Sequence, residues 1–115
     1  MSSPSPKPRG EFHGALVIRL QDHGILTSTY FNNGDPVPYP ETARRQSTDL
    51  PGANPFVGKF DCIWLEKNEH HKVTLIIKKE PTDIAYELRW IDKNNNVNFE
   101  GRAALENGIL FGYYS

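Results

Sequence analysis

The chain has 115 residues, a formal net charge of −1 and one cysteine, and a chain of this length suits one domain with a single core. The nearly balanced charge gives no electrostatic reason to expect nucleic acid or an anionic membrane as a partner. One cysteine excludes an internal disulfide and a thiolate zinc cluster. The sequence has no run of about 18 apolar residues and no apolar leader, so we expect a soluble, cytoplasmic protein.

The two ends of the chain differ in composition. Residues 1–10 hold three prolines, three serines and almost no large apolar side chain, a composition typical of a disordered tail. Residues 11–115 are expected to form a single β-barrel domain. Within it, residues 32–55 contain five prolines and are predicted to be a long loop that closes or lines one end of the barrel.

Most of the remaining chain alternates apolar and polar residues with a period of two, which is typical of half-buried strands. Asn107-Gly108 is a strong hairpin signal, and other short polar turns separate the alternating segments. The sequence therefore predicts an all-β, antiparallel up-and-down meander that closes into a small barrel of about seven to eight strands. The alternating segments are 15–21, 25–31, 57–67, 72–79, 83–92, 97–105 and 109–114.

One side of these strands collects large apolar and aromatic side chains and is predicted to face the barrel interior. Its small members, Gly101 and Ala103, fit either close packing or space for a ligand, and packing is the favoured interpretation. The predicted inward residues are Phe60, Cys62, Trp64, Val73, Leu75, Ile77, Ile84, Tyr86, Leu88, Trp90, Val97, Phe99, Gly101, Ala103 and Leu105.

Several glycines and aromatic residues have a spacing that resembles the lipocalin-like (calycin) barrels. The residues that carry the resemblance are Phe56-Val-Gly58-Lys-Phe60, Trp64, Tyr86, Trp90, Phe99-Glu-Gly101, Asn107-Gly108-Ile-Leu110 and Tyr114. Gly58 and Trp64 are six residues apart, whereas the lipocalin Gly-x-Trp pattern places them two apart. The resemblance implies a barrel for a small ligand and assigns no catalytic residue.

The predicted function is the binding of a small apolar or aromatic molecule in an aromatic-lined cavity. Tyr and Trp combine apolar surface with a polar group that can orient a ligand. No cofactor, nucleic acid or membrane is expected, and a second copy of the chain stays open as a partner. The candidate ligand-binding residues are Trp64, Tyr86, Trp90, Phe99 and Tyr114.

Two other classes of function stay open. One is a protein-interaction or inhibitor module that presents residues 32–55, and the other is a small barrel cyclase or isomerase. The enzyme needs an inward carboxylate or histidine, and the predicted inward set has none. His70 and His71 are predicted to lie in a turn, and no third ligand for a metal is identifiable. Cys62 is interpreted as a small buried hydrophobe.

Overall fold

The computed structural model describes residues 13–22, 24–49, 52–66, 69–81 and 84–115. The predicted tail at residues 1–10 lies outside these ranges. The described chain forms eight strands and no helix that could cross a membrane, and the prediction of an all-β fold is confirmed. The strands are β1 (Gly14–Asp22), β2 (Ile25–Asn32), β3 (Asp35–Arg45), β4 (Gly58–Glu66), β5 (Glu69–Lys79), β6 (Ala85–Ile91), β7 (Val97–Glu106) and β8 (Ile109–Tyr114).

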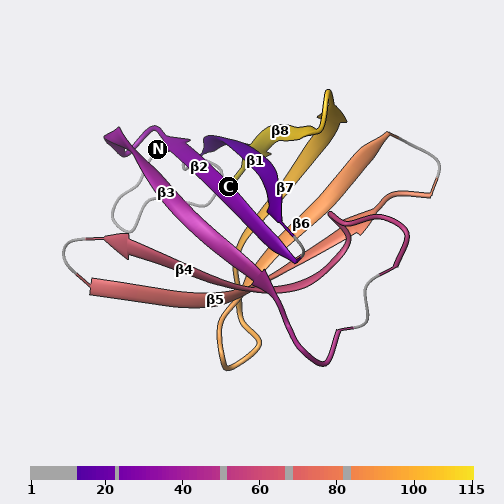
Figure 1. Cartoon of the computed structure of the whole chain (residues 1–115). Helices are drawn as coiled ribbons and strands as arrows, with labels where there is room; N and C mark the ends of the chain where they lie inside the picture. The colour runs from indigo at the N-terminus through magenta and orange to yellow at the C-terminus, as the bar shows by residue number, and fades with distance from the viewer. Residues whose placement is uncertain (1–12, 23, 50–51, 67–68, 82–83) are drawn as a thin grey trace.

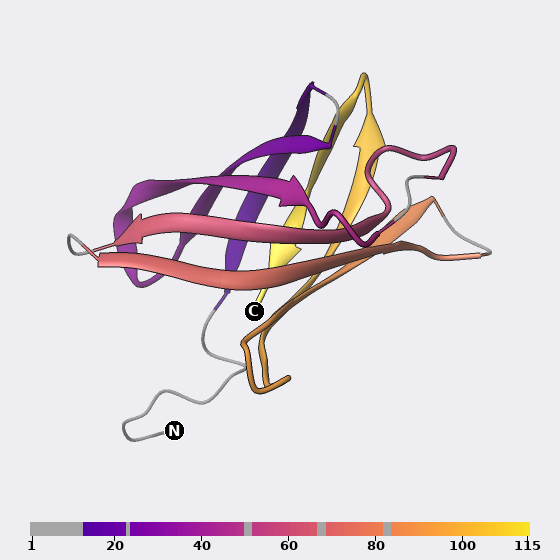
Figure 2. The ribbon, with the colours of Figure 1, turned by 60° about the horizontal axis from the view of Figure 1, so that its bottom comes forward.

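The strands form an antiparallel meander in which every strand pairs with its neighbours in sequence (Figure 1). The last strand, β8, also pairs with β1 from Gly14↔Tyr114 to Arg19↔Ile109, which closes the sheet into a barrel. Turning the molecule shows β3, β4 and β5 running side by side along one wall (Figure 2). The predicted barrel is therefore confirmed, with eight strands among the described residues.

The sequence predicted seven strand segments, and the strand that it did not predict is β3. This strand occupies part of the predicted loop at 32–55, so that prediction is wrong for residues 35–45. Prolines discouraged a strand there because proline cannot donate a ladder hydrogen bond. The pairing with β4 begins only at Glu41, so Pro36, Pro38 and Pro40 lie in the half of β3 that pairs with β2 alone. Their missing N–H groups interrupt no ladder with β4.

The strand β5 begins earlier than the sequence predicted. It extends back to Glu69, so the backbone of His70 and His71 pairs with β4 instead of forming the predicted turn. The prediction of a four-residue turn at 68–71 is therefore wrong.

The two ends of the barrel differ in the segments that meet there. The connections β1–β2, β3–β4, β5–β6 and β7–β8 meet at one end, where the buried ring of Phe56 joins the core; we call it the Phe56 end. We call the other end the Trp90 end, because Trp90 lies near the end of β6. It contains the connections β2–β3, β4–β5 and β6–β7, together with the start of β1 and the end of β8.

Side chains from every strand fill the interior. Most described members of the predicted inward set are buried, among them Phe60, Leu75, Ile77 and Leu88, which are all fully enclosed. β1 and β2 add inward residues that complete the ring of strands: Leu16, Ile18, Leu26, Ser28 and Tyr30. The alternation of the sequence therefore corresponds to a real inner face.

Three residues predicted to face inward are exposed instead. Val97 pairs with the outward Ile91 because a β-bulge between β6 and β7 skips Asn98, which moves Val97 to the outer face. Leu105 and Ile84 are exposed as well, and both lie one residue beyond Ala85↔Ala104, the pair at which β6 and β7 stop pairing.

Gly101 allows a close approach between strands inside the barrel. A Cβ there would lie 2.5 Å from the backbone oxygen of Tyr113 and 3.4 Å from the Trp90 ring. This confirms the packing interpretation of the small residue at position 101.

We predict that Gly101→Ala lowers the free energy of unfolding by about 1–3 kcal/mol, because the added methyl forces β7 and β8 apart. Urea unfolding followed by Trp fluorescence measures the change. Gly52→Ala is the control, since a Cβ at Gly52 meets no atom within 4 Å. Equal stability of the Gly101→Ala variant and the wild-type protein would contradict the packing described here.

Candidate functional site

Four aromatic rings from four strands meet inside the Trp90 end. The Tyr30 ring lies 5.9 Å from the Trp90 ring and 5.5 Å from the Tyr114 ring, measured between centroids. Tyr114 also lies 5.8 Å from Trp90 and 5.8 Å from Phe99. Three of the four contacts are edge-to-face, the arrangement that aromatic quadrupoles favour. Trp90, Phe99 and Tyr114 come from the consecutive strands β6, β7 and β8, and the pairing of β8 with β1 brings Tyr30 on the distant strand β2 to them.

A carboxyl group, that of Glu41, lies among these rings. The alternation along β3 turns Glu41 and Ala43 inward, while Thr42 and Arg44 are exposed. Glu41 is 5% exposed, and the Tyr30 hydroxyl donates a short hydrogen bond to its Oε1 atom. An acidic side chain is rarely buried to this degree unless it is paired.

Burial raises the pKa of the Glu41 carboxyl from its ordinary value of 4.5 to about 7. Loss of hydration disfavours the ionised form, and this is the largest cause. Hydrogen bonds from Tyr30, Cys62 and Trp90 act in the opposite direction because they stabilise the carboxylate, but they do not offset burial. The carboxyl therefore gains or loses its proton near neutral pH.

The two titratable neighbours of Glu41 remain neutral. Burial, and then the charge of Glu41, raise the pKa of the Tyr30 hydroxyl well above its ordinary value. The same two causes, in the same order, raise the pKa of the Cys62 thiol. A thiol that resists deprotonation is a poor nucleophile, which agrees with the interpretation of Cys62 as a buried hydrophobe.

The Ser28 hydroxyl is the one described buried polar side-chain group without a hydrogen-bond partner. Ser28 is 5% exposed and pairs directly with Glu41 across β2 and β3. Its hydroxyl lies near enough to Tyr30 to lower the pKa of Tyr30 slightly, against the larger effects of burial and Glu41, but makes no hydrogen bond of normal geometry. A buried hydroxyl without a partner is costly and requires an explanation.

Among the described side chains, no lysine, arginine or histidine forms an ion pair with Glu41. The donors that the described side chains offer to the ionised carboxylate, on Tyr30, Cys62 and Trp90, are all neutral. We call Ser28, Tyr30, Glu41, Trp90 and Tyr114 the carboxyl–aromatic cluster. It offers a carboxyl, an unused hydroxyl and ring surfaces, which together suit the binding of a small molecule with one polar group.

The predicted site residues divide into three groups. Trp90, Phe99 and Tyr114 meet at the Trp90 end, as a shared site requires. Tyr86 is buried on the same strand as Trp90 but four residues away, about 13 Å along β6, and belongs to the Phe56 end. The backbone of Trp64 pairs with Glu41, and its side chain lies outside the described set.

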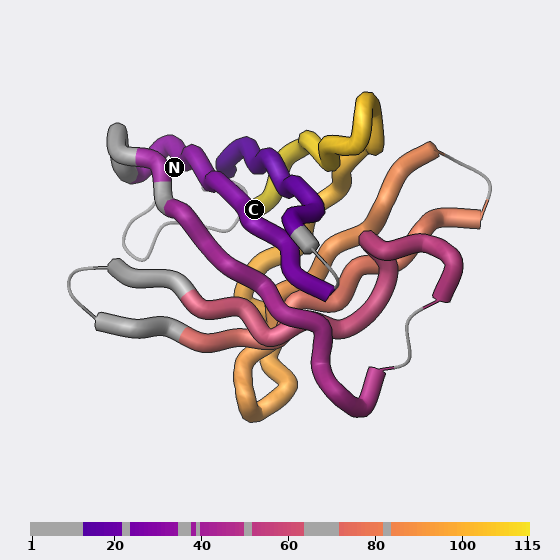
Figure 3. Tube along the Cα trace, viewed as in Figure 1, coloured from indigo at the N-terminus to yellow at the C-terminus, as the bar shows by residue number. Residues whose placement is uncertain are grey.

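Tyr86 takes part in closing the Phe56 end. Its hydroxyl accepts a hydrogen bond of 2.8 Å from the Asn54 amide. The segment that carries Asn54 and the buried Phe56 leaves the end of β3 and reaches the side of the molecule where β6 begins (Figure 3). Arg45 anchors its start, with an ion pair of 2.7 Å to Asp49. The described part of 46–57 therefore packs against the Phe56 end of the barrel through Asn54 and Phe56.

Sequence reasoning missed Ser28, Tyr30 and Glu41. The alternation along 25–31 already placed Ser28 and Tyr30 on one face with Leu26, so a signal for them was present. Glu41 was hidden because residues 35–45 were interpreted as a loop. The statement that no carboxylate faces inward is thus wrong.

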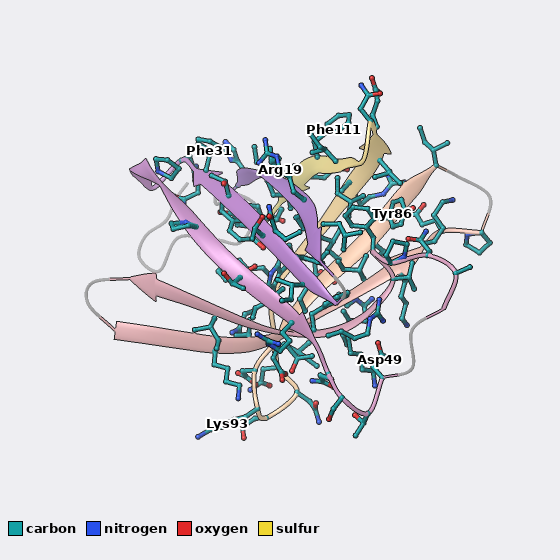
Figure 4. The ribbon with its side chains drawn as sticks, viewed as in Figure 1. Arg19, Phe31, Asp49, Tyr86, Lys93 and Phe111 are labelled. Carbon is teal, nitrogen blue, oxygen red and sulfur yellow. The ribbon has the colours of Figure 1, made fainter. Side chains whose placement is uncertain are left out.

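The outer wall carries charges of both signs and several exposed aromatic residues. Arg102 on β7 donates two hydrogen bonds of 3.0 Å to the carboxylate of Glu80, the residue that follows β5. Figure 4 shows Phe31, Arg19 and Phe111 along the upper edge over β2, β1 and β8, away from Tyr86. A second copy of the chain as a partner stays a prediction.

Metal ligation has no support in the described part of the chain, where no three His, Cys, Asp or Glu side chains come together. The side chains of His70 and His71 lie outside that part. Comparisons with protein-family models, with curated proteins and with solved structures find no match to this chain.

The raised pKa of Glu41 predicts how stability depends on pH. Below about pH 4.5 both the folded and the unfolded chain hold this proton, so Glu41 carries no ionisation penalty. Between about pH 4.5 and 7 the unfolded chain releases the proton and the folded protein keeps it, so stability falls as pH rises. The rise in the pKa from 4.5 to about 7 corresponds to a loss of about 3 kcal/mol in the free energy of unfolding. This loss is complete above about pH 7.

We therefore predict that the stability of the wild-type protein relative to Glu41→Gln falls by about 3 kcal/mol between pH 4.5 and pH 8. Urea unfolding of both proteins across this range measures the difference in their free energies of unfolding. Both proteins contain the same four histidines, so the contribution of the histidines to the pH dependence cancels in this difference. Glu106→Gln, the same change at the exposed last residue of β7, is the control and leaves the profile unchanged. A difference independent of pH would contradict the burial of Glu41.

Proposed function

We propose that this protein binds a small, largely apolar molecule inside the Trp90 end, in the manner of a lipocalin-like (calycin) barrel. One observation carries the proposal: a buried carboxyl without a described cation lies beside a buried hydroxyl without a partner, among aromatic rings. The closed eight-stranded architecture supports it, because barrels of this size hold one small ligand or fill with side chains.

The energetics favour a role in binding over a role in folding. A carboxyl and an unused hydroxyl inside a barrel both cost stability relative to apolar residues of similar size. Perturbed titratable groups of this kind concentrate at functional sites. A ligand that supplies hydrogen bonds to Glu41 and Ser28 would recover both costs.

The Trp90 end is the expected entrance. Phe56 is buried at the opposite end, and the described residues around it are held by hydrogen bonds. The rings of the cluster contact one another, so a ligand reaches Glu41 when one of them moves. Phe99 is half-buried at the edge of the cluster, where it contacts the Tyr114 ring, and it is the expected moving ring because the other three rings are buried.

Native mass spectrometry tests the proposal. Protein purified without denaturation, and then incubated with a small-molecule extract of its expression host, is expected to carry a bound molecule. Ser28→Ala is expected to retain less of it and to fold at least as well, because the hydroxyl that it loses has no partner. A bare protein mass under both conditions would overturn the proposal.

Two control variants separate this site from the rest of the barrel. Thr42→Ala makes a comparable change on the exposed face of β3, and Tyr86→Phe removes the hydroxyl at the Phe56 end. Both are expected to retain the ligand. Loss of the ligand in Tyr86→Phe would instead place binding at the Phe56 end, against the proposal.

Acid–base catalysis by the same barrel is a second candidate, favoured by the position of Glu41. A general acid or base works best when its pKa is near the working pH, and that of Glu41 is raised to about 7. If the protein is a cyclase or isomerase, the wild-type protein and Glu41→Gln will carry different compounds, because the variant holds unconverted substrate. Chromatography of the released molecules distinguishes them, and identical compounds would exclude Glu41 as the catalytic group.

A further inference from the structure

We propose that the ligand of the carboxyl–aromatic cluster is an organic ammonium ion, whose charge pairs with Glu41 between the rings of Tyr30, Trp90 and Tyr114. The inference rests on the proposed function and specifies the chemical class of the ligand. It is carried by the chemistry of the cluster, whose groups are all acceptors, neutral donors or aromatic surfaces.

The charge of the cluster favours a cation. Within the described chain, Glu41 is the only carboxyl group buried in the core, and it has no cationic partner there. A neutral ligand would leave the carboxylate without a counter-charge, and an anionic ligand would be repelled by it. An ammonium group supplies the missing charge and converts a costly buried ion into a pair.

The aromatic rings add a second attraction for positive charge. The negative face of an aromatic ring attracts a cation within about 6 Å of its centroid, most strongly for Trp. Tyr30, Trp90 and Tyr114 have ring centroids 5.5 to 5.9 Å from one another, and two of these side chains, Tyr30 and Trp90, hydrogen-bond to the Glu41 carboxylate. An ammonium group near Glu41 is therefore within reach of several rings, and the same rings cover its apolar part.

The Ser28 hydroxyl offers a second hydrogen-bond acceptor for the ammonium group, next to the Glu41 carboxylate. Directly opposite residues on antiparallel strands have Cβ atoms about 5 Å apart, so the Ser28 hydroxyl and the Glu41 carboxylate can reach one nitrogen. A primary or secondary ammonium group carries at least two N–H donors. One bond to Glu41 and one to Ser28 Oγ would satisfy both groups, and would give Ser28 the partner that it lacks among the described residues.

The protonation state of Glu41 makes this binding depend on pH. Among the described side chains, the other titratable groups near Glu41 are Tyr30 on β2 and Cys62 on β4, and Tyr114 on β8 contacts the Tyr30 ring. The backbone of His71 on β5 pairs with Trp64, which pairs with Glu41, and the His71 side chain lies outside the described set. The pKa values of Tyr30 and Cys62 are raised, so neither ionises near neutral pH. Binding of an ammonium ion is therefore expected to strengthen with rising pH up to about 7 and then level off.

The test uses three small probes of similar size: butylammonium, 1-butanol and butyrate. Each is titrated into the full-length, 15N-labelled protein, and the indole N–H signal of Trp90 is followed by NMR. The chain has two tryptophans, so Trp64→Phe identifies the Trp90 signal. Butylammonium is expected to shift this signal at pH 8, with affinity falling about tenfold per pH unit below about 7.

Matched variants separate charge from shape. Glu41→Gln is expected to weaken butylammonium binding at pH 8 by more than about tenfold, as for a lost charge-assisted hydrogen bond, while Glu106→Gln leaves it unchanged. Equal binding of 1-butanol, preferential binding of butyrate, or full affinity in Glu41→Gln overturns the ammonium inference and leaves the binding function standing. No response to butylammonium also overturns the inference, and the mass-spectrometric test then decides the binding function separately.

Discussion

The pairing of β8 with β1 is the constraint on which the rest of this structure depends. Closure forces the inward side chains of β2, β3, β6 and β8 into one small volume, so that Tyr30, Glu41, Trp90 and Tyr114 meet although 84 positions separate the first from the last. An open sheet would expose the same residues to water, where the Glu41 carboxyl would ionise as an ordinary glutamate does. The chemistry of the interior therefore follows from closure.

Two opposing effects then set the properties of Glu41. Loss of hydration favours its neutral form, and donors on Tyr30, Cys62 and Trp90 favour its charged form. Loss of hydration outweighs the donors and raises the pKa to about 7, so the carboxyl changes charge near neutral pH. The charge of the Glu41 carboxyl therefore responds strongly to a new neighbour. A cation nearby favours the ionised carboxylate, and an apolar neighbour favours the neutral acid.

The strand pattern, the meander and most of the core are predictable because alternation, Asn-Gly turns and short connections are local signals. The errors arise where a feature of neighbouring strands decides the outcome. Val97 turns outward because of a bulge that involves Ile91, and β3 tolerates three prolines because β4 pairs only with its second half. Neither fact is visible in the segment itself.

The candidate site was predictable in part for the same reason. Trp90, Phe99 and Tyr114 were named from their inward positions, and they do meet. Tyr86 shares their face but lies at the other end of the barrel, since alternation gives the side of a strand and not the height along the barrel. Glu41 required knowledge of β3, which only the pairing with β2 and β4 reveals.

The most direct test of this account is the titration of Glu41 itself, followed by NMR of its side-chain carboxyl carbon in the folded protein. We expect a midpoint of about pH 7, with the Trp90 indole N–H signal changing over the same range. A midpoint near 4.5, the ordinary value for a glutamate, would mean that water reaches the carboxyl and would contradict the buried cluster on which the proposed function depends.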